Sequence, residues 1–424
     1  MELPSLSKIE YFFSKFLYKF PKIRKMIIFL YLRLFSIINF KKRSLSHKYK
    51  IQQVGPQNDN SFFGYFDYSP SNHNGLILCH HTKLSTSSLP KNNRPIFISV
   101  FDSNNIKVPI ITTYSFSYNW QQGSRLKWLN NLRFIYNDFD FKNKKYISYL
   151  FCLKEKKVIS KFNYPNYAVH KDKFFLSLKT ERLSLLQEEY GYFNKPPMKL
   201  TESKILNRDG VTYIDLESGN AKILFSLEDC LQLISRKIPI NSDHVINHLL
   251  ISQDGNKFVF LYRIFINKKR IDFLIEYDLI LEKLKLIINS CLISHYCWID
   301  NIYLLVFMYK DNKKGSYYKV NIQNGKITNI FSDDKLNISD GHPSMISSFK
   351  FITDTYPDRN RIQKLLLIDI DKKKIENILD FSSDLKFSGI SRCDMHPRYD
   401  NHNKKIFFDT GNNCKRKLNF IDFK

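Results

Sequence analysis

The stretch HLLISQDGNKFVFLYR, residues 248–263, contains the pattern that decides the fold. A histidine opens it, a turn at Asp254 and Gly255 follows, and an apolar run typical of a strand closes it. Three later stretches have the same order, and they read HYCWIDNIYLLVFMY from 295, HPSMISSFKFITDTY from 342 and HPRYDNHNKKIFFDT from 396. The leading histidines are 47, 47 and 54 residues apart, which indicates a repeated structural unit.

Three earlier copies of this unit lack the histidine. They read FFGYFDYSPSNHNGLILCHH from 62, QQGSRLKWLNNLRFIYND from 121 and PNYAVHKDKFFLSLK from 165. The third copy carries an excursion over about 180–207 before its outer strands. A second pair of strands follows in most copies, so each unit is a sheet of four strands and about 45–60 residues. Seven such units predict an all-β protein, a seven-bladed β-propeller.

The ends of the chain supply the last blade and an additional segment. The run YKIQQV, residues 49–54, is placed to complete the blade that ends in KLNFIDF, residues 417–423. Closure of this kind removes the exposed edge that an open ring of sheets would leave. We therefore expect the propeller to occupy 49–424 and a short helical segment to occupy 1–48.

The first 50 residues hold 12 Lys and Arg against two Glu, so about +10 of the net charge of +26 lies there. The apolar run Met26–Phe40 is about 15 residues long and contains Arg33, whereas a membrane-spanning helix needs roughly 20 apolar residues. An amphipathic helix lying in the membrane interface fits this composition, because basic residues flank the apolar run. A helix packed on the propeller is the alternative.

The basic composition favours anionic partners. No nucleic-acid-binding motif occurs in the 424 residues, so an acidic oligo- or polysaccharide and the membrane surface are expected, and nucleic acid is not. Seven scattered cysteines without a C-x-x-C pair are typical of a reducing compartment. We therefore predict a cytoplasmic protein at the periphery of the inner membrane.

Equivalent positions of successive blades face one central channel, so the four repeat histidines are expected to converge. They are His248, His295, His342 and His396. Other polar residues accompany them in the sequence: His244 and Asn247 precede the first, and Arg392 and Asp394 precede the last. Imidazole and carboxylate groups at one channel mouth can bind a divalent metal, or supply a general base and charge neutralisation for an acidic sugar.

Earlier repeats offer residues suited to a sugar. Tyr65 and Asp67 in the first copy, and Trp120, Gln121 and Gln122 in the second, lie near the position that histidine takes later. Aromatic rings stack on sugars, and amides and carboxylates pair with hydroxyls. For Trp120 a plain core role is the alternative.

The excursion carries one further candidate. Its helical stretch could cover the channel mouth and bring Arg182 inward, where a guanidinium would pair with a carboxylate or phosphate. An exposed helix with a solvated Arg182 is the alternative.

The motifs HVINHLLISQDGNKFVFLYR, SDGHPS, TDTYPD and RCDMHPR with IFFDT resemble the propeller proteins related to oligogalacturonate lyases, over about 55–424. SFFGYFDYSP and NWQQGSRLKW resemble the branch found in bacterial surface-polysaccharide gene clusters. This resemblance implies a manganese-like ion held by histidines and a glutamine, and a separate histidine as the base for β-elimination from a uronate.

By local motif, His248 resembles the base, and His342 and His396 resemble two metal ligands. Where the lyase pattern has a third histidine this chain has Asp394, and where it has the glutamine this chain has Ser391. His342, Asp394 and His396 are therefore the expected metal set, with Arg392 or Arg182 neutralising charge.

Three functions are compatible with these patterns. The first is an enzyme that acts on an acidic glycan by metal-assisted β-elimination or a related reaction. The second is a membrane-associated, glycosyl-transferring component of O-antigen or capsule synthesis. The third is a propeller that binds a glycan or protein without catalysis.

Overall fold

The computed structural model describes Ile27 and residues 49–423, except 92, 235–236, 311–313 and 332–338. The segment predicted over 1–48 thus lies outside the described residues, apart from Ile27. Among the described residues, no helix has both the length and the apolar character needed to cross a membrane.

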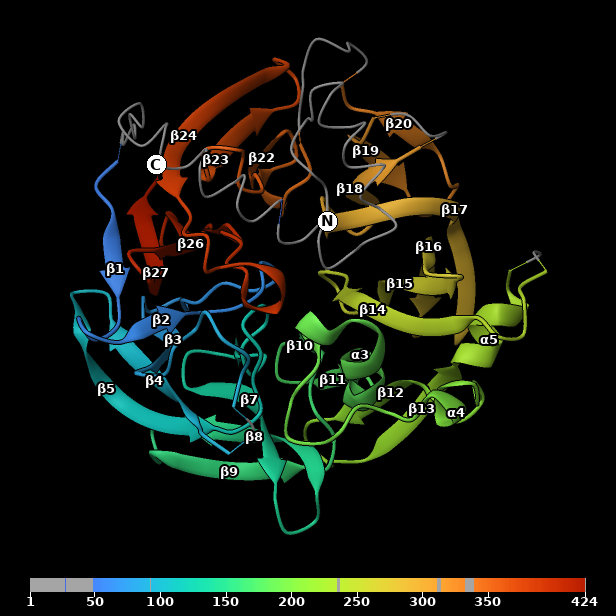
Figure 1. Ribbon diagram of the computed structural model, residues 1–424, viewed down its shortest axis with the longest axis horizontal. Helices are drawn as coiled ribbons and strands as arrows, with labels where there is room; N and C mark the ends of the chain where they lie inside the picture. Colours follow the sequence, from blue (N-terminus) through green and yellow to red (C-terminus); the bar gives the residue numbers. More distant parts are fainter. Residues whose placement is uncertain are drawn as a thin grey trace.

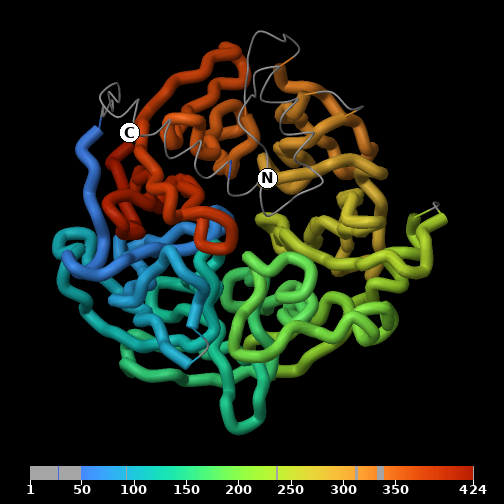
Figure 2. Tube along the Cα trace, viewed as in Figure 1, coloured from blue at the N-terminus to red at the C-terminus, as the bar shows by residue number. Residues whose placement is uncertain are grey.

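Over the described residues, seven four-stranded antiparallel blades surround a central axis (Figures 1 and 2). The first three comprise β2–β5 (Asn60–Phe62, Ile77–Thr82, Ile96–Asp102, Asn105–Ser115), β6–β9 (Lys127–Trp128, Arg133–Asp140, Lys145–Cys152, Lys157–Phe162) and β10–β13 (Ala168–His170, Phe174–Ser177, Gly210–Asp215, Ala221–Ser226). The prediction of a seven-bladed β-propeller is confirmed.

Blades 4 and 5 form one continuous seven-stranded sheet. Its strands are β14 (Asp243–Ile251), β15 (Lys257–Ile266), β16 (Lys269–Asp278), β17 (Lys283–Trp298), β18 (Tyr303–Tyr309), β19 (Ser316–Asn321) and β20 (Ile327–Asn329). The 16-residue β17 pairs with β16 through its first part and with β18 through its second, so it is the outer strand of blade 4 and the inner strand of blade 5.

The last blade is closed by the beginning of the described propeller. Blade 6 consists of β21–β24 (Ser344–Ser347, Lys350–Asp354, Ile362–Asp369, Lys374–Ser382), and blade 7 of β25–β27 (Arg398–Asp400, Lys405–Asn412, Lys415–Asp422) with β1 (Gln52–Val54). In β1, Val54 pairs with Leu418 and Gln52 with Phe420. The predicted closure by residues 49–54 is therefore present.

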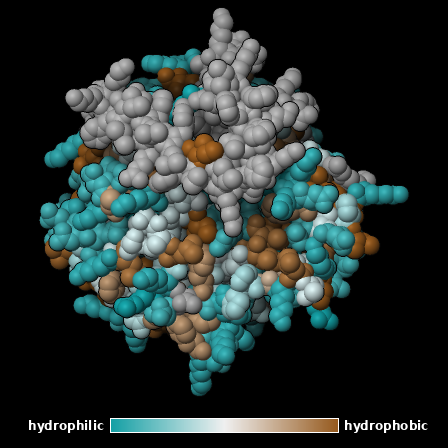
Figure 3. All heavy atoms as spheres, viewed as in Figure 1, coloured by the Kyte–Doolittle hydropathy of each residue, from teal (hydrophilic) through white to brown (hydrophobic). Residues whose placement is uncertain are grey.

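The core lies between neighbouring blades. In β15 the run from Phe258 to Ile264 is buried, because residues on both faces of this strand contact an adjacent blade. Each fully buried aliphatic or aromatic side chain stabilises the fold by about 1.5–3 kcal/mol. In Figure 3, most residues drawn in colour along the lower and lateral rim of this face are hydrophilic.

The excursion leaves blade 3 between β11 and β12. It contains α3 (Thr180–Leu186), the 3₁₀ helix η3 (Glu188–Tyr190) and α4 (Leu200–Ser203). In Figure 1, α3 lies near the centre of the ring beside β14. Two further helices of the described residues are α5 (Leu227–Gln232), which leads into blade 4, and η4 (Gly389–Ser391), which leads into blade 7.

Candidate functional site

The four repeat histidines converge at the centre of the propeller, as predicted. The ring centroids of His248 and His295 are 5.9 Å apart, those of His295 and His342 are 4.1 Å apart, and those of His342 and His396 are 4.3 Å apart. All four side chains are buried. We call these four residues the histidine cluster.

The backbone is irregular at or next to three of these four histidines. His248 and His396 have φ values of 56° and 46°, in the left-handed region that non-glycine residues rarely adopt. The β14–β15 pairing shifts register between Asn247 and Leu250, and the β17–β18 pairing shifts between Ile293 and Tyr296, an interval that contains His295. Such bulges re-aim side chains next to functional sites.

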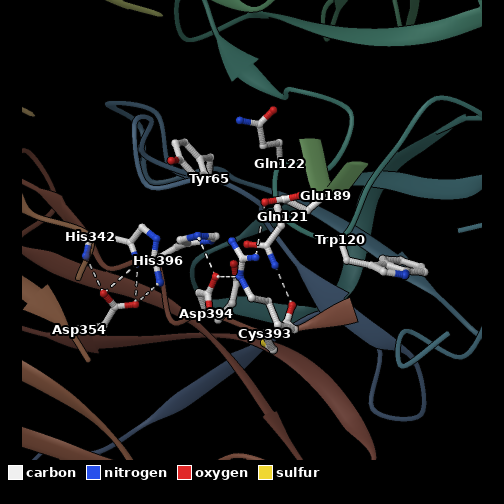
Figure 4. Close-up of polar contacts among 12 residues, drawn as sticks. Tyr65, Trp120, Gln121, Gln122, Glu189, His342, Asp354, Cys393, Asp394 and His396 are labelled. Atoms are coloured by element: carbon white, nitrogen blue, oxygen red, sulfur yellow. Dashed lines mark hydrogen bonds and ion pairs between the residues drawn. The ribbon is translucent and has the colours of Figure 1, made fainter. Parts of the chain in front are cut away.

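The expected metal set is brought together. One ligand atom from each of His342, Asp394 and His396 can be chosen so that all three lie within 4.8 Å of one another (Figure 4). In the described part of the chain, the Nε2 atoms of both histidines are buried and have no hydrogen-bond partner. We call these three residues the candidate metal group.

The other ring nitrogen of each histidine is held in place. Nδ1 of His342 lies 2.9 Å from Oδ1 of Asp354, and Nδ1 of His396 lies 2.8 Å from the carbonyl oxygen of Gly64. Asp354 also accepts hydrogen bonds from the backbone N–H groups of His342 and His396, at 2.7 and 3.1 Å. Partners of this kind place the proton on Nδ1 and leave Nε2 free to bind a metal.

Gly64 is required where blade 1 meets blade 2. Its φ is +129°, and a Cβ there would lie 2.7 Å from the carbonyl oxygen of Gln122. A side chain would therefore push the two backbones apart and displace the carbonyl that orients His396. Arg398 donates to the same carbonyl, which ties this segment to blade 7.

Electrostatics at Asp394 and His396 favour a cation. Burial alone would raise the pKa of Asp394, but the Arg392 guanidinium and His342 outweigh it and hold that pKa below its usual value. Burial, together with His342 and Arg398, holds the pKa of His396 well below 6.5, so its imidazole is neutral at neutral pH. A carboxylate and a neutral imidazole are the forms that bind metals.

Protonation of His342 is favoured by the carboxylate it contacts. Burial alone would lower the pKa of His342, but the Asp354 carboxylate outweighs burial and raises it.

Two imidazoles and one carboxylate with further positions open suit a divalent cation such as Mn²⁺ or Zn²⁺. The residues present therefore fit the ion that the resemblance implies. Ser391, the residue at the position of the glutamine in the lyase pattern, donates a hydrogen bond from its hydroxyl to the carbonyl oxygen of Ser388.

Tyr65 and His248 form a hydrogen-bonded pair beside this group. The Tyr65 hydroxyl lies 2.7 Å from Nδ1 of His248, and the Tyr65 ring centroid lies 5.1 Å from that of His396. Burial raises the pKa of Tyr65 well above 10, and burial with Arg263 lowers that of His248 well below 6.5. Both are neutral at pH 7. Tyr65, His248, Tyr167 and Tyr296 line a cavity of about 20 Å³, room for about one water.

The excursion covers the histidine cluster through residues that the sequence did not single out. The Tyr190 ring centroid lies 5.4 Å from that of His248 and 6.0 Å from that of Tyr65. Gln187 accepts a hydrogen bond of 2.7 Å from the Asn247 amide. Glu189 lies 3.8 Å from Arg392, which also pairs with Asp394 at 2.7 Å.

Arg182 does not reach the cluster. Its guanidinium is buried, pairs with Asp209 and donates to the carbonyl oxygens of Ser203 and His244 at 2.8 and 3.1 Å. Arg182 therefore ties the excursion to β14. The side chain neither faces the channel nor is exposed to solvent, the two positions that the sequence predicted for it. His244 likewise turns to its own blade, where Nδ1 lies 2.7 Å from the Tyr262 hydroxyl.

The candidates from the early blades divide into two kinds. Trp120 points away from the histidines (Figure 4), packs with Phe62 and donates to the carbonyl of Ser88, so the core alternative describes it. Asp67 pairs with buried Arg125 at 2.7 Å. The remaining two are channel residues: Gln121 donates to the carbonyl of Arg392 at 2.8 Å, and Gln122 donates to the hydroxyl of Tyr167 at 3.3 Å.

Two missed residues left a signal in the sequence. Asp354 and Tyr356 lie in TDTYPD, the strand end that follows the His342 repeat. The Tyr356 ring centroid is 6.0 Å from that of His342. Reading the whole motif, rather than its leading histidine, would have identified both. Tyr190 and Glu189 lie in the excursion, which has no counterpart in other blades, so no repeat position marks them.

Comparison with known proteins identifies solved structures that have the same fold. No protein-family model and no protein of curated function matches this sequence. Among solved structures, an oligogalacturonate lyase in complex with manganese matches with a TM-score of 0.59 and 11% identity, over 90% of this chain and 96% of the lyase. An oligogalacturonate lyase from Vibrio parahaemolyticus matches with a TM-score of 0.58 and 11% identity, over 89% and 96%. This chain therefore shares their propeller fold.

Proposed function

We propose that this protein is a carbohydrate-active β-propeller that acts on an acidic glycan at the histidine cluster, by β-elimination from a uronate. One observation carries the proposal: two buried, unpartnered Nε2 atoms converge with the Asp394 carboxylate, and a Tyr65–His248 pair lies beside them. A site for a cation next to a candidate base is what this reaction needs.

The candidate metal group would hold the cation through Nε2 of His342, Nε2 of His396 and a carboxylate oxygen of Asp394. When bound, a divalent cation supplies Lewis-acid polarisation of a substrate carboxylate, which acidifies the adjacent C–H bond. Arg392 is partly exposed beside Asp394 and brings a second positive charge to the same place. An acidic sugar is thereby favoured over a neutral one.

His248 is assigned the role of general base. When Nδ1 donates its proton to the Tyr65 oxygen, Nε2 keeps its lone pair and can take the proton next to the substrate carboxylate. The C–O bond one carbon further then breaks, a C=C bond forms, and the departing oxygen takes up a proton. In this tautomer the Tyr65 oxygen accepts the hydrogen bond from Nδ1 and orients the imidazole for the step.

Assays of uronate oligosaccharides test this assignment. His248→Ala is expected to lower kcat by at least about 100-fold, because positioned general bases contribute about 10²–10⁴-fold. The readout is the absorbance of the new C=C bond conjugated to the carboxylate. His244→Ala is the matched control, since His244 faces Tyr262 and not the cluster, and it should retain turnover. Equal turnover by His248→Ala would refute the role of His248.

The cellular setting that we propose is assembly or processing of a bacterial surface polysaccharide at the cytoplasmic face of the inner membrane. The motifs SFFGYFDYSP and NWQQGSRLKW and the charge of about +10 within residues 1–50 support it. Deleting residues 1–45 should move the protein from the membrane to the soluble fraction of lysed cells. An unchanged distribution would count against a membrane role for this segment.

A glycosyl-transferring or purely binding propeller is the second candidate, and the basic first 50 residues favour the membrane-associated transferase form. Neither glycosyl transfer nor binding without catalysis forms an unsaturated product. Metal analysis of purified protein combined with the elimination assay separates them: a bindable cation with no elimination product would favour transfer, and neither cation nor product would favour binding alone.

A further inference from the structure

A second concave site lies outside the histidine cluster, between blades 4 and 5. A groove of about 990 Å³ is formed by the end of β15, the start of β16, the middle of β17 and the end of β18. Ligand sites typically have volumes of about 300–1,000 Å³. We call it the blade 4–5 groove, and nothing in the reaction proposed above uses it.

The floor of this groove is aliphatic. Its apolar lining includes Ile266, Ile271, Ile287, Ile288, Leu292 and Met308. Met308 and Ile288 are buried, whereas Leu292 is 43% exposed and presents its side chain to solvent. Tyr309 is the single aromatic residue among the described lining residues. Sugars are bound mainly on aromatic faces, so this floor suits a hydrocarbon chain better than a glycan.

The described charged residues that line the groove are all basic. Lys269, Arg270 and Lys310 line it, and the described lining residues include no Asp or Glu. Two more lysines, Lys268 and Lys314, are exposed on the hairpins that flank it. An aliphatic floor with a cationic rim is complementary to an amphiphile that has an anionic head group.

The lining residue Arg270 connects the groove to the strand that carries His295. Arg263 and Arg270 share one carboxylate, Asp272, at 3.4 and 3.2 Å, so the three residues carry an excess positive charge. Both guanidinium groups also contact the carbonyl oxygen of Ile293, two residues before His295 in β17. A head group on Arg270 would therefore lie next to the strand that carries His295.

We propose that the blade 4–5 groove binds a single anionic lipid, with its aliphatic chain on the floor over β17 and its phosphate on Lys269, Arg270 and Lys310. This site is separate from the reaction proposed above and does not depend on it. It gives the propeller itself an affinity for membrane lipid.

Calorimetric titration of the full chain with dodecyl phosphate, below the concentration at which it forms micelles, tests the proposal. A monomeric probe avoids vesicles, to which the basic first 50 residues could bind by themselves. We expect saturable binding at one site. Dodecyl maltoside, which lacks the anion, and inorganic phosphate, which lacks the chain, should each bind at least tenfold more weakly.

Two groove variants and two matched controls complete the test. The double variant Lys269→Glu, Lys310→Glu and the single variant Leu292→Glu should each weaken dodecyl phosphate binding at least tenfold. The double variant Lys142→Glu, Lys145→Glu on blade 2 and the single variant Leu132→Glu, whose side chain is 50% exposed, make the same changes elsewhere and should bind like the wild type. Thermal melting checks that each variant is folded. If Leu292→Glu does not fold, the double lysine variant, which changes two exposed residues, decides the test.

The proposal is overturned by any of three results. They are the absence of saturable binding by the wild type, unchanged affinity in the groove variants, and inorganic phosphate binding as tightly as dodecyl phosphate. The last result would indicate a phosphate site to which the aliphatic floor contributes nothing.

Discussion

Asp354 connects the two histidines of the candidate metal group. Its carboxylate contacts Nδ1 of His342 and the backbone N–H groups of both His342 and His396. One side chain therefore sets the orientation of ligands that come from two different blades. Asp354 would not contact the metal, and it is a positioning residue.

Asp354→Asn should lower Mn²⁺ affinity by about 10–100-fold, as expected when a carboxylate that orients a histidine ligand is lost. The amide keeps the size of the side chain but loses the charge that favours the Nδ1 proton. Titration calorimetry with Mn²⁺ measures the effect. Asp371→Asn, in an exposed turn of the same blade, is the control, and unchanged affinity in Asp354→Asn would contradict the positioning role.

His80 makes the folded state sensitive to acid. It is buried between blades 1 and 2, where Nε2 accepts a hydrogen bond of 3.0 Å from the backbone N–H of Ser124. Burial lowers its pKa from 6.5 to about 3. Above about pH 6.5 the imidazole is neutral in both states, so it adds no pH dependence there.

Between about pH 6.5 and 3, the unfolded chain binds a proton at His80 and the folded chain does not. The free energy of unfolding therefore falls as pH falls, by up to about 1.4 kcal/mol per pH unit for this group. His80→Gln should reduce that slope, measured by urea unfolding from pH 7 to 4. His73→Gln, on the exposed surface, should keep the wild-type slope. Equal slopes for the wild type and both variants would contradict this effect of His80.

At the scale of elements, the repeat in the sequence predicted the arrangement of strands and histidines better than individual residues predicted their contacts. Because blades have one strand order, a histidine at one position of four repeats had to face one axis, and residues 49–54 had to close blade 7. The Tyr65–His248 hydrogen bond was not predictable, since it joins blades 1 and 4 across the channel. Arg182 does not face the channel as expected, because it forms an ion pair with Asp209, which lies just after the excursion in the sequence.

The continuity of strand β17 is not evident from the sequence. Its sequence from 283 to 298 contains Asn289 and Ser290, which interrupt the apolar pattern and read as a turn. The backbone instead accommodates them through register shifts in the β16–β17 pairing, with Ser290 at a φ of 54°. Sequence pattern alone does not distinguish a bulge from a turn at such a point.

Val54→Thr tests the contribution of β1 to closure. Val54 is fully buried and pairs with Leu418. Threonine has the same shape but buries a hydroxyl, at a cost of about 1–3 kcal/mol. Urea unfolding should show this loss of stability. Gln53→Thr, on the exposed side of the same strand, should change stability by less than about 0.5 kcal/mol, and equal effects would contradict a specific contribution from the buried face.

For the whole molecule, a cation at the candidate metal group would join blades 6 and 7. His342 precedes β21, and Asp394 and His396 precede β25. A ligand that binds only the native state stabilises it by about 2.7 kcal/mol at 100 times its Kd.

Thermal unfolding should therefore move to higher temperature with Mn²⁺ and return with a chelator. The double variant His342→Ala, His396→Ala should melt at the same temperature with and without Mn²⁺. His73→Ala, a surface histidine, should keep the wild-type response. An increase that persists in the double variant would place the ion elsewhere.

The closure of blade 7 also constrains the order of events during synthesis. Gln52 in β1 contacts Asp422 in β27, and these residues are 370 positions apart. Ribosomes add about 5–20 residues per second, so β1 waits roughly 20 to 70 seconds for its partner. Through that time six blades can assemble while the seventh stays open. The nascent chain thus carries an unpaired strand until β27 has left the ribosome, and chaperones would have the most to protect at that stage.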